Sequence, residues 1–309
     1  MPIAAAGPMR GIVLKLVSVL IFLAMQTLIK LAGTGVNPGQ IVFYRSAFAL
    51  VPIMAYLVYR GELRQSFVTE SPFGHFKRGF IGVLSMGCAF YGLTKLPLPE
   101  WIAIGYAMPL FSVFFAWALL GEPVRIYRWT AVAVGLVGVL IISWPKLTLF
   151  RSMGLGSGEA LGALVVLFSA ASAALAMIQI RILVRSEKTP TIVLYFSITS
   201  SVLALLTLPF GWSWLSMSQT VLLVMAGFCG GVAQILLTES YRHADVSTIA
   251  PFEYSSILFG ILVSWAIFSE VPEWTMLIGT AITISAGIYI IHRERRLQRE
   301  MLSSEAPVR

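Results

Sequence analysis

Long apolar runs separated by short polar breaks follow one another along the whole chain. Each run has about 20 residues, enough for a helix rising ~1.5 Å per residue to cross a hydrocarbon core of ~30 Å. Helices are predicted, because lipid offers no hydrogen bonds and the alternation of a barrel strand is absent. We therefore predict an all-α integral membrane protein with ten spans: Gly11–Gly33, Gly39–Tyr59, Arg78–Lys95, Glu100–Leu120, Tyr127–Trp144, Gly158–Ile180, Thr189–Phe210, Ser216–Thr238, Ser247–Phe268 and Trp274–His292.

The charged residues support this count and orient the chain. Only 12% of the 309 residues are charged, about half the share in a soluble domain. Of the 22 Lys and Arg residues, 17 fall on one predicted side, four on the other and Arg45 inside a span. Basic residues concentrate in cytoplasmic loops, so both termini are predicted to be cytoplasmic and the chain to lie in the inner membrane. The net charge of +8 does not indicate nucleic acid, because the basic residues lie between apolar runs.

An internal repeat divides the chain into halves at residues 1–150 and 151–309. The first three matched pairs are 148 residues apart and the fourth is 149 apart: Tyr106 with Tyr254, Trp117 with Trp265, Glu122 with Glu270, and Gly138 with Gly287. Five spans per half is an odd number, so the second half must enter the membrane from the opposite side. Two inverted five-helix repeats are typical of secondary transporters.

Three groups of residues resemble the motifs of a known family. The segments Met108–Leu110 and Trp117–Pro123 are similar to the fourth-helix motif of the EamA family in the drug/metabolite transporter superfamily. Phe43–Phe48 resembles its second-helix motif, and Ile249–Tyr254 with Phe268–Glu270 resembles the matching part of the second half. The resemblance covers essentially the whole chain and implies two EamA repeats. It is nearest to uptake-type members for S-adenosylmethionine or riboflavin.

The second half departs from this pattern at one position. Ser269 stands where the first half has Gly121. The resemblance therefore does not establish a shared turn geometry at the two breaks.

Ionisable groups inside the spans are the first candidates for function, because each costs about 2.5–3.5 kcal/mol or more in the membrane. Arg45 either anchors an anionic group of the substrate or has a structural role, which its place in a family-wide motif favours. Glu253 follows Pro251, and a carboxylate beside Tyr254 can bind a substrate or take up a proton; a network near Arg242 is the alternative. Lys30 lies near the outer end of the first span, where it can reach water or touch substrate.

Aromatic and amide side chains within the spans are the second group of candidates. Such groups orient ligands in apolar cavities, although packing explains each of them equally well. They are Gln26, Tyr91, Trp101, Tyr106, Gln179, Gln234, Tyr241 and Tyr254. Tyr106, Gln234 and Tyr254 are expected in the middle of a helix.

No catalytic residues, cofactor or metal site are predicted. The three histidines lack metal-ligand spacing, and no phosphate-binding loop is present. Gly158-x3-Gly162 and Gly227-x3-Gly231 permit close helix approach and allow a homodimer as one arrangement. The main hypothesis is a secondary carrier for a small metabolite, driven by protons through Glu253 or by the substrate gradient alone. A membrane scaffold is the alternative, and a membrane-embedded enzyme is a distant third; substrate and direction stay open.

Overall fold

The computed structural model describes residues 8–33, 35–121, 126–153, 158–183, 186–243, 252 and 255–304. Helices account for most of these residues, and none of them lies in a strand. The longer helices are α1 (Pro8–Ala32), α2 (Pro38–Tyr59), α4 (Pro72–Leu93), α7 (Ile126–Met153), α8 (Gly158–Leu183), α9 (Thr189–Leu205), α10 (Met217–His243) and α13 (Trp274–Ser304). The shorter elements are α3 (Leu63–Ser66), α5 (Leu98–Gly105), α6 (Ala107–Leu120), the 3-10 turn η2 (Leu208–Phe210), α12 (Ser255–Val263) and the π-helical segment η4 (Ser264–Phe268).

Every predicted span overlaps a helix. Within the described residues, five helices are long and apolar enough to cross a membrane, namely α1, α2, α5 with α6, α8 and α10, and shorter apolar stretches lie in α7, α9, α12 with η4, and α13. The helix α4 belongs to neither group, and its first two turns carry His75, Lys77 and Arg78. The ninth predicted span is described only at residue 252 and from Ser255 onward. The all-helical class is confirmed, whereas the count of ten spans stays a prediction.

Local sequence signals explain where several helices begin. Asn37 precedes α2, its side chain accepts a hydrogen bond of 2.8 Å from the backbone N–H of Gly39, and Pro38 follows in the first turn. Prolines also occupy the first turn of α4, α5 and α9. A proline is favoured at this position because its missing N–H would have no partner inside the helix.

The outer faces of the helices carry exposed apolar stripes. Val13, Val17 and Leu20 form one on α1, at the spacing of a single helix face. A second stripe follows α10 through Val221, Met225 and other residues. Faces of this kind suit contact with lipid, as expected for a multi-pass membrane protein.

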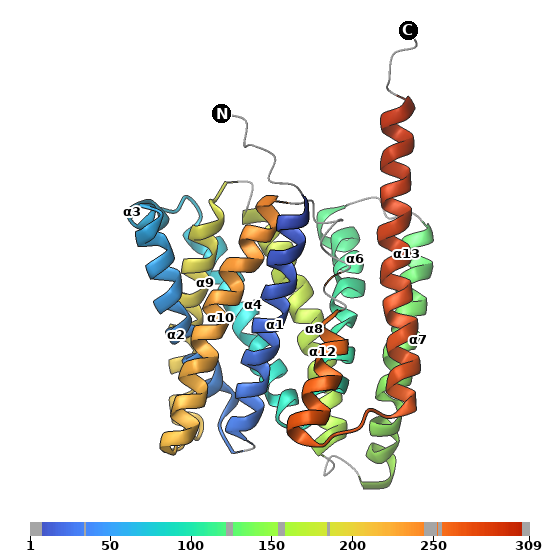
Figure 1. Cartoon of the computed structure of the whole chain (residues 1–309), viewed down its shortest axis with the longest axis horizontal. Coiled ribbons are helices and arrows are strands. Elements are labelled where there is room, and N and C mark those ends of the chain that lie inside the picture. Colours follow the sequence, from blue (N-terminus) through green and yellow to red (C-terminus); the bar gives the residue numbers. More distant parts are fainter. Residues whose placement is uncertain are drawn as a thin grey trace.

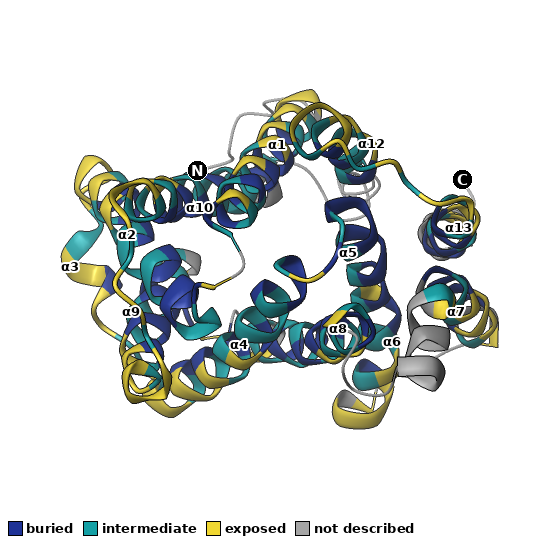
Figure 2. Ribbon diagram, turned by 90° about the horizontal axis from the view of Figure 1, so that it is seen from below, coloured by how far each residue is buried: buried dark blue, intermediate teal, exposed yellow. Residues whose placement is uncertain are grey.

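Helices from the first half of the chain alternate in space with helices from the second half (Figures 1 and 2). The helix α1 packs against α10 and α8 packs against α4, while α2 packs against both α9 and α10, and α4 against α9. The helices α7 and α13 pack against each other at one end of the bundle (Figure 2). The start of α1 and the end of α13 lie at the same end of the molecule (Figure 1).

The glycine motifs make close contacts inside this chain. A Cβ on Gly231 would lie 2.6 Å from the carbonyl oxygen of Ala49 in α2, and one on Gly227 would lie 2.6 Å from that of Tyr44. A Cβ on Gly162 would lie 3.0 Å from Cβ of Lys95. Both motifs therefore serve intramolecular packing here, and the homodimer stays a prediction.

The fourth predicted span is broken, which corrects the expectation of one helix through Tyr106. The helix α5 ends at Gly105 and α6 begins at Ala107, so Tyr106 lies at the break and not within a helix. Pro109 supplies the physical reason, because it has no N–H to donate to the carbonyl group of Gly105.

Candidate functional site

Arg45 lies inside the bundle, about two turns into α2. The residue is 6% exposed. Opposite it on α10 is Gly230, where a Cβ would lie 3.4 Å from Nε of Arg45 and 2.9 Å from Sδ of Met25 in α1. The glycine therefore makes the space in which the side chains of Arg45 and Met25 meet α10.

A second arginine, Arg78 of α4, approaches the same region. Its guanidinium carbon lies 3.9 Å from the ring centroid of Phe196 in α9, and that of Arg45 lies 5.8 Å from the same centroid. Gly82 makes room here, since a Cβ on it would lie 2.5 Å from Nη1 of Arg78 and 2.6 Å from Cε2 of Phe196. The two arginines and Phe196 form what we call the arginine cluster.

Several buried polar atoms on the helices that carry this cluster have no hydrogen-bond partner. They are Nε of Arg45, Nε and Nη1 of Arg78, and the hydroxyl oxygens of Ser46 and Ser200. These residues lie on α2, α4 and α9, which all contact one another. Unpaired buried polar groups are rare because each costs free energy. Chemically, two uncompensated guanidinium groups attract an anion and repel a cation.

A small cavity of about 20 Å³ lies among α2, α9 and α10, and no residue of the arginine cluster lines it. Apolar side chains line most of it, together with the Tyr56 hydroxyl, which donates a hydrogen bond of 2.5 Å to Glu239.

An ion pair joins distant parts of the chain at the end where α1 finishes. Nζ of Lys30 lies 2.7 Å from Oε1 of Glu270 and also donates to the carbonyl oxygen of Leu96 at 3.0 Å. The other carboxylate oxygen of Glu270 accepts from the hydroxyl of Ser264 at 2.5 Å and from the backbone N–H of Leu98 at 3.2 Å. This pair links α1, the turn before α5 and the turn after η4.

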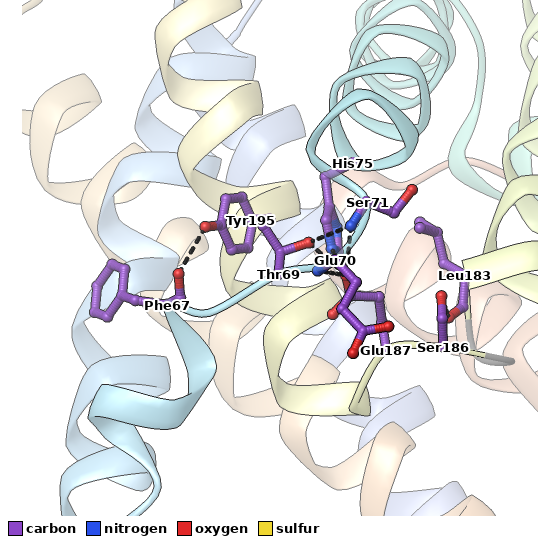
Figure 3. A network of polar contacts seen from close by, with 9 residues as sticks. All are labelled: Phe67, Thr69, Glu70, Ser71, His75, Leu183, Ser186, Glu187 and Tyr195. Carbon is purple, nitrogen blue, oxygen red and sulfur yellow. Dashed lines mark hydrogen bonds and ion pairs between the residues drawn. The ribbon is translucent and has the colours of Figure 1, made fainter.

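A second polar network lies at the opposite end of the bundle, where α4 begins (Figure 3). Oε1 of Glu187 accepts hydrogen bonds from the Thr69 hydroxyl and from the backbone N–H groups of Glu70 at 2.9 Å and Ser71 at 3.1 Å. Nε2 of His75 lies 3.4 Å from the same oxygen, longer than a good hydrogen bond. We call these five residues the Glu187 network.

The charge of Glu187 is favoured by its partners. Burial alone would raise the pKa of this carboxyl group, but the hydrogen bonds from Thr69, Ser71 and Glu70 and the nearby His75 outweigh it and hold the pKa below its ordinary value. The ring of Tyr195 stacks on that of His75 at 4.6 Å, and its hydroxyl donates to the carbonyl oxygen of Phe67 at 2.9 Å. The network therefore ties the segment before α4 to α9.

The other predicted site residues make separate contacts. The Tyr106 hydroxyl lies 2.6 Å from that of Ser256 in α12. The indole N–H of Trp101 donates to the carbonyl oxygen of Ala89 at 2.7 Å, and Nζ of Lys95 lies 5.8 Å from the ring centroid of Tyr91. The side chains of Gln26, Gln179 and Gln234 are half-buried.

Three predicted residues are not placed. Glu253 and Tyr254 lie outside the described residues, as does the side chain of Tyr241 in α10. The proton-binding role of Glu253 therefore stays a prediction.

Sequence reasoning missed Arg78, Phe196 and Glu187. The charge pattern assigned Arg78 to the cytoplasmic boundary, and nothing in the apolar run of α9 distinguishes Phe196. The pairing of Lys30 with Glu270 was also missed. A signal for it existed, because the predicted span order places the end of the first span, near Lys30, and the end of the ninth span, near Glu270, on the same side of the membrane.

The fold has relatives. A family model, the EamA-like transporter family, matches residues 9–144 and again residues 160–292. A solved structure, described as the crystal structure of a protein, superposes with a TM-score of 0.64 at 19% identity, over 93% of this chain and 98% of the other. At this identity the likeness concerns the fold alone.

Curated relatives are similar over nearly their whole length. The chain is 25% identical to the S-adenosylmethionine uptake transporter of Rickettsia felis, covering 93% of this chain and 94% of the relative. It is 30% identical to the pseudopaline exporter CntI of Pseudomonas aeruginosa, covering 91% and 93%. It is 27% identical to the riboflavin transporter of Vibrio cholerae, covering 94% and 96%.

Proposed function

We propose that this chain, which belongs to the EamA-like transporter family and is a small-molecule membrane transporter, works by alternating access between two inverted halves. In this proposal the halves are residues 1–150 and 151–309, with ten spans and both termini in the cytoplasm. The protein lies in the inner membrane and acts as a carrier, without enzymatic chemistry of its own.

The mirrored packing of the helices carries the proposal. Numbering the spans from one to ten, the contact of the first with the eighth (α1 with α10) corresponds to that of the sixth with the third (α8 with α4). Likewise, the contact of the second with the eighth (α2 with α10) corresponds to that of the seventh with the third (α9 with α4). Such exchanged pairings are what a two-fold relation between inverted halves requires.

The two helix breaks supply a second correspondence. Gly121 has φ 64° and ψ 20°, and Ser269 has φ 55° and ψ 26°, both in the left-handed region. The backbone N–H of Gly121 donates to Ala116, and that of Ser269 donates to Ser264. The two breaks therefore share their turn geometry, although serine replaces glycine in the second half.

In the proposed cycle, the polar contacts at the two ends act as gates. The Lys30–Glu270 pair joins the two halves at the outer end, and the Glu187 network joins them at the cytoplasmic end. The arginine cluster lies between these ends and includes residues of both halves. Opening either gate while the other stays closed would expose the cluster to one side only.

Transport is tested by loading purified protein into liposomes and measuring exchange of labelled S-adenosylmethionine, riboflavin and amino acids. We expect at least one compound to exchange in a protein-dependent way. Failure of every compound to exchange would favour the scaffold interpretation over the carrier mechanism. Because the relatives include both an uptake transporter and an exporter, uptake and efflux should be measured separately.

Energy coupling to protons is a separate part of the proposal. If Glu253 carries the proton, Glu253→Gln should abolish the pH dependence of uptake while leaving counterflow exchange in place. Uptake with unchanged rate and pH dependence in this variant would exclude Glu253 as the proton carrier and leave exchange along the substrate gradient.

A further inference from the structure

The arginine cluster concentrates positive charge that the protein does not neutralise. Among the described residues, the ion pairs are Lys30–Glu270, Arg60–Glu62 and His75–Glu187, and neither Arg45 nor Arg78 has an ion pair or a hydrogen bond. Each charge within a membrane span is costly by itself. The two guanidinium carbons lie within about 10 Å of each other, so the like charges also repel in a medium of low dielectric constant.

Local packing offsets only a small part of this cost. The Phe196 ring attracts both cations, but a cation–π contact at these distances is weaker than an ion pair. Water is the other source of compensation, and it reaches part of Arg78, which is half-buried. It hardly reaches Arg45, which is 6% exposed. A structural role alone would be served better by an acidic partner or an apolar side chain.

The shape of the cluster indicates what neutralises it. Nitrogens of Arg45 and Arg78 are unpaired, and so are the hydroxyls of Ser46 on α2 and Ser200 on α9, which can donate further hydrogen bonds. Guanidinium groups match carboxylate and phosphate oxygens in a two-point geometry. Phe196 provides an apolar face for the carbon part of the same ligand.

We propose that Arg45 and Arg78 together bind the anionic group of the transported solute, so that the substrate is an organic anion bearing a carboxylate or a phosphate. This inference rests on the proposed transport function and names the substrate class for the site between the two gates. Both arginines belong to the first half and Phe196 to the second, so a bound anion would contact both halves.

The test uses pairs of probes that share an aromatic body and differ in whether they carry an anionic group. N-acetylphenylalanine and its neutral amide form one pair, and benzyl phosphate with benzyl alcohol forms the second. Binding is measured by calorimetry on the full-length protein in nanodiscs of zwitterionic lipid, and transport by counterflow.

In the wild type, the anion of at least one pair should bind at least about tenfold more tightly than its uncharged counterpart, as expected for charge-assisted hydrogen bonds. Arg45→Gln and Arg78→Gln should each bring this ratio close to one, whereas Arg78→Lys should keep part of it. Arg60→Gln, which removes an exposed arginine, should leave the ratio unchanged. The ratio is informative in any variant that stays folded, including the lysine variant.

Any other result would overturn either the anion site or the transport proposal. Transport of neutral or cationic solutes with no preference for anions, or a preference that survives both glutamine variants, would overturn the anion site while transport stands. Binding of anions that depends on both arginines, without movement of any compound, would overturn the transport proposal while the anion site stands. Loss of solute binding in nanodiscs with anionic lipid would assign the cluster to a lipid headgroup and overturn its assignment to the solute.

Discussion

Replacing Glu187 by glutamine should loosen the end of the bundle where α4 begins without unfolding the protein. Three donors, the Thr69 hydroxyl and the N–H groups of Glu70 and Ser71, converge on one carboxylate oxygen. Glutamine keeps an acceptor oxygen at that place and removes the charge. A hydrogen bond to a charged group contributes about 1.5–3 kcal/mol, against about 0.5–1.5 kcal/mol for a neutral one. At about 1 kcal/mol for each of the two backbone donors, the loss that amide exchange reports is about 2 kcal/mol, or about thirtyfold in the opening equilibrium.

Hydrogen exchange measures this opening directly, because the amides of Glu70 and Ser71 are themselves donors to Glu187. We expect the peptide covering residues 68–75 to exchange about thirtyfold faster in Glu187→Gln, with α8 and α10 unchanged. The matched control is Glu62→Gln, because Glu62 pairs with Arg60 at 3.3 Å on the exposed surface, where such pairs contribute little. Equal exchange in the two variants would refute the assignment of this network as a gate.

The pH dependence of the same signal follows from the lowered pKa of Glu187. A carboxylate with a lowered pKa in the folded state contributes stability that is present above its unfolded pKa, about 4.3. This contribution is lost as the pH falls through the lower folded value. Protection of Glu70 and Ser71, corrected for intrinsic exchange, should therefore persist from pH 8 to pH 5. Its loss near pH 6 would indicate control by His75 instead.

Three further predictions concern stability, measured by reversible unfolding in detergent. Lys30→Met and Glu270→Gln should each destabilise the protein, but their effects should not add, because each removes the same partly buried ion pair. We expect a coupling free energy of about 1–2 kcal/mol between the two substitutions. Simple additivity would show that the pair contributes nothing to stability. Ser269→Gly should stabilise by about 1 kcal/mol, because Ser269 has φ 55° and only glycine adopts this conformation without strain; a lower melting temperature would contradict it. Gly138→Ala should destabilise by about 1–3 kcal/mol, because its Cβ would lie 2.7 Å from the carbonyl oxygen of Gly279 where α7 and α13 cross; unchanged stability would mean that this crossing adjusts freely.

The apolar pattern was sufficient to predict the helices, because in lipid a run of about 20 apolar residues has few alternatives to a helix. It was less informative about interruptions inside a run. The break at Tyr106 changes neither the length nor the hydropathy of the segment, so only Pro109 indicated it. The shared turn at Gly121 and Ser269 could not be predicted either, since serine usually avoids a positive φ and is held there by its surroundings.

The arginine cluster shows why the candidate site was predicted only in part. Sequence patterns locate a backbone position along the membrane normal, and by that measure Arg78 belongs to the cytoplasmic boundary while Arg45 lies in a span. An arginine side chain reaches several ångströms from its Cα atom, however, and usually extends toward water. Here Arg78 extends inward instead, onto Phe196, because Gly82 leaves the space one helical turn further along. The direction of a long charged side chain is thus decided by the neighbouring helices, and the meeting of Arg78 with Arg45 required three helices to be packed before it could be seen.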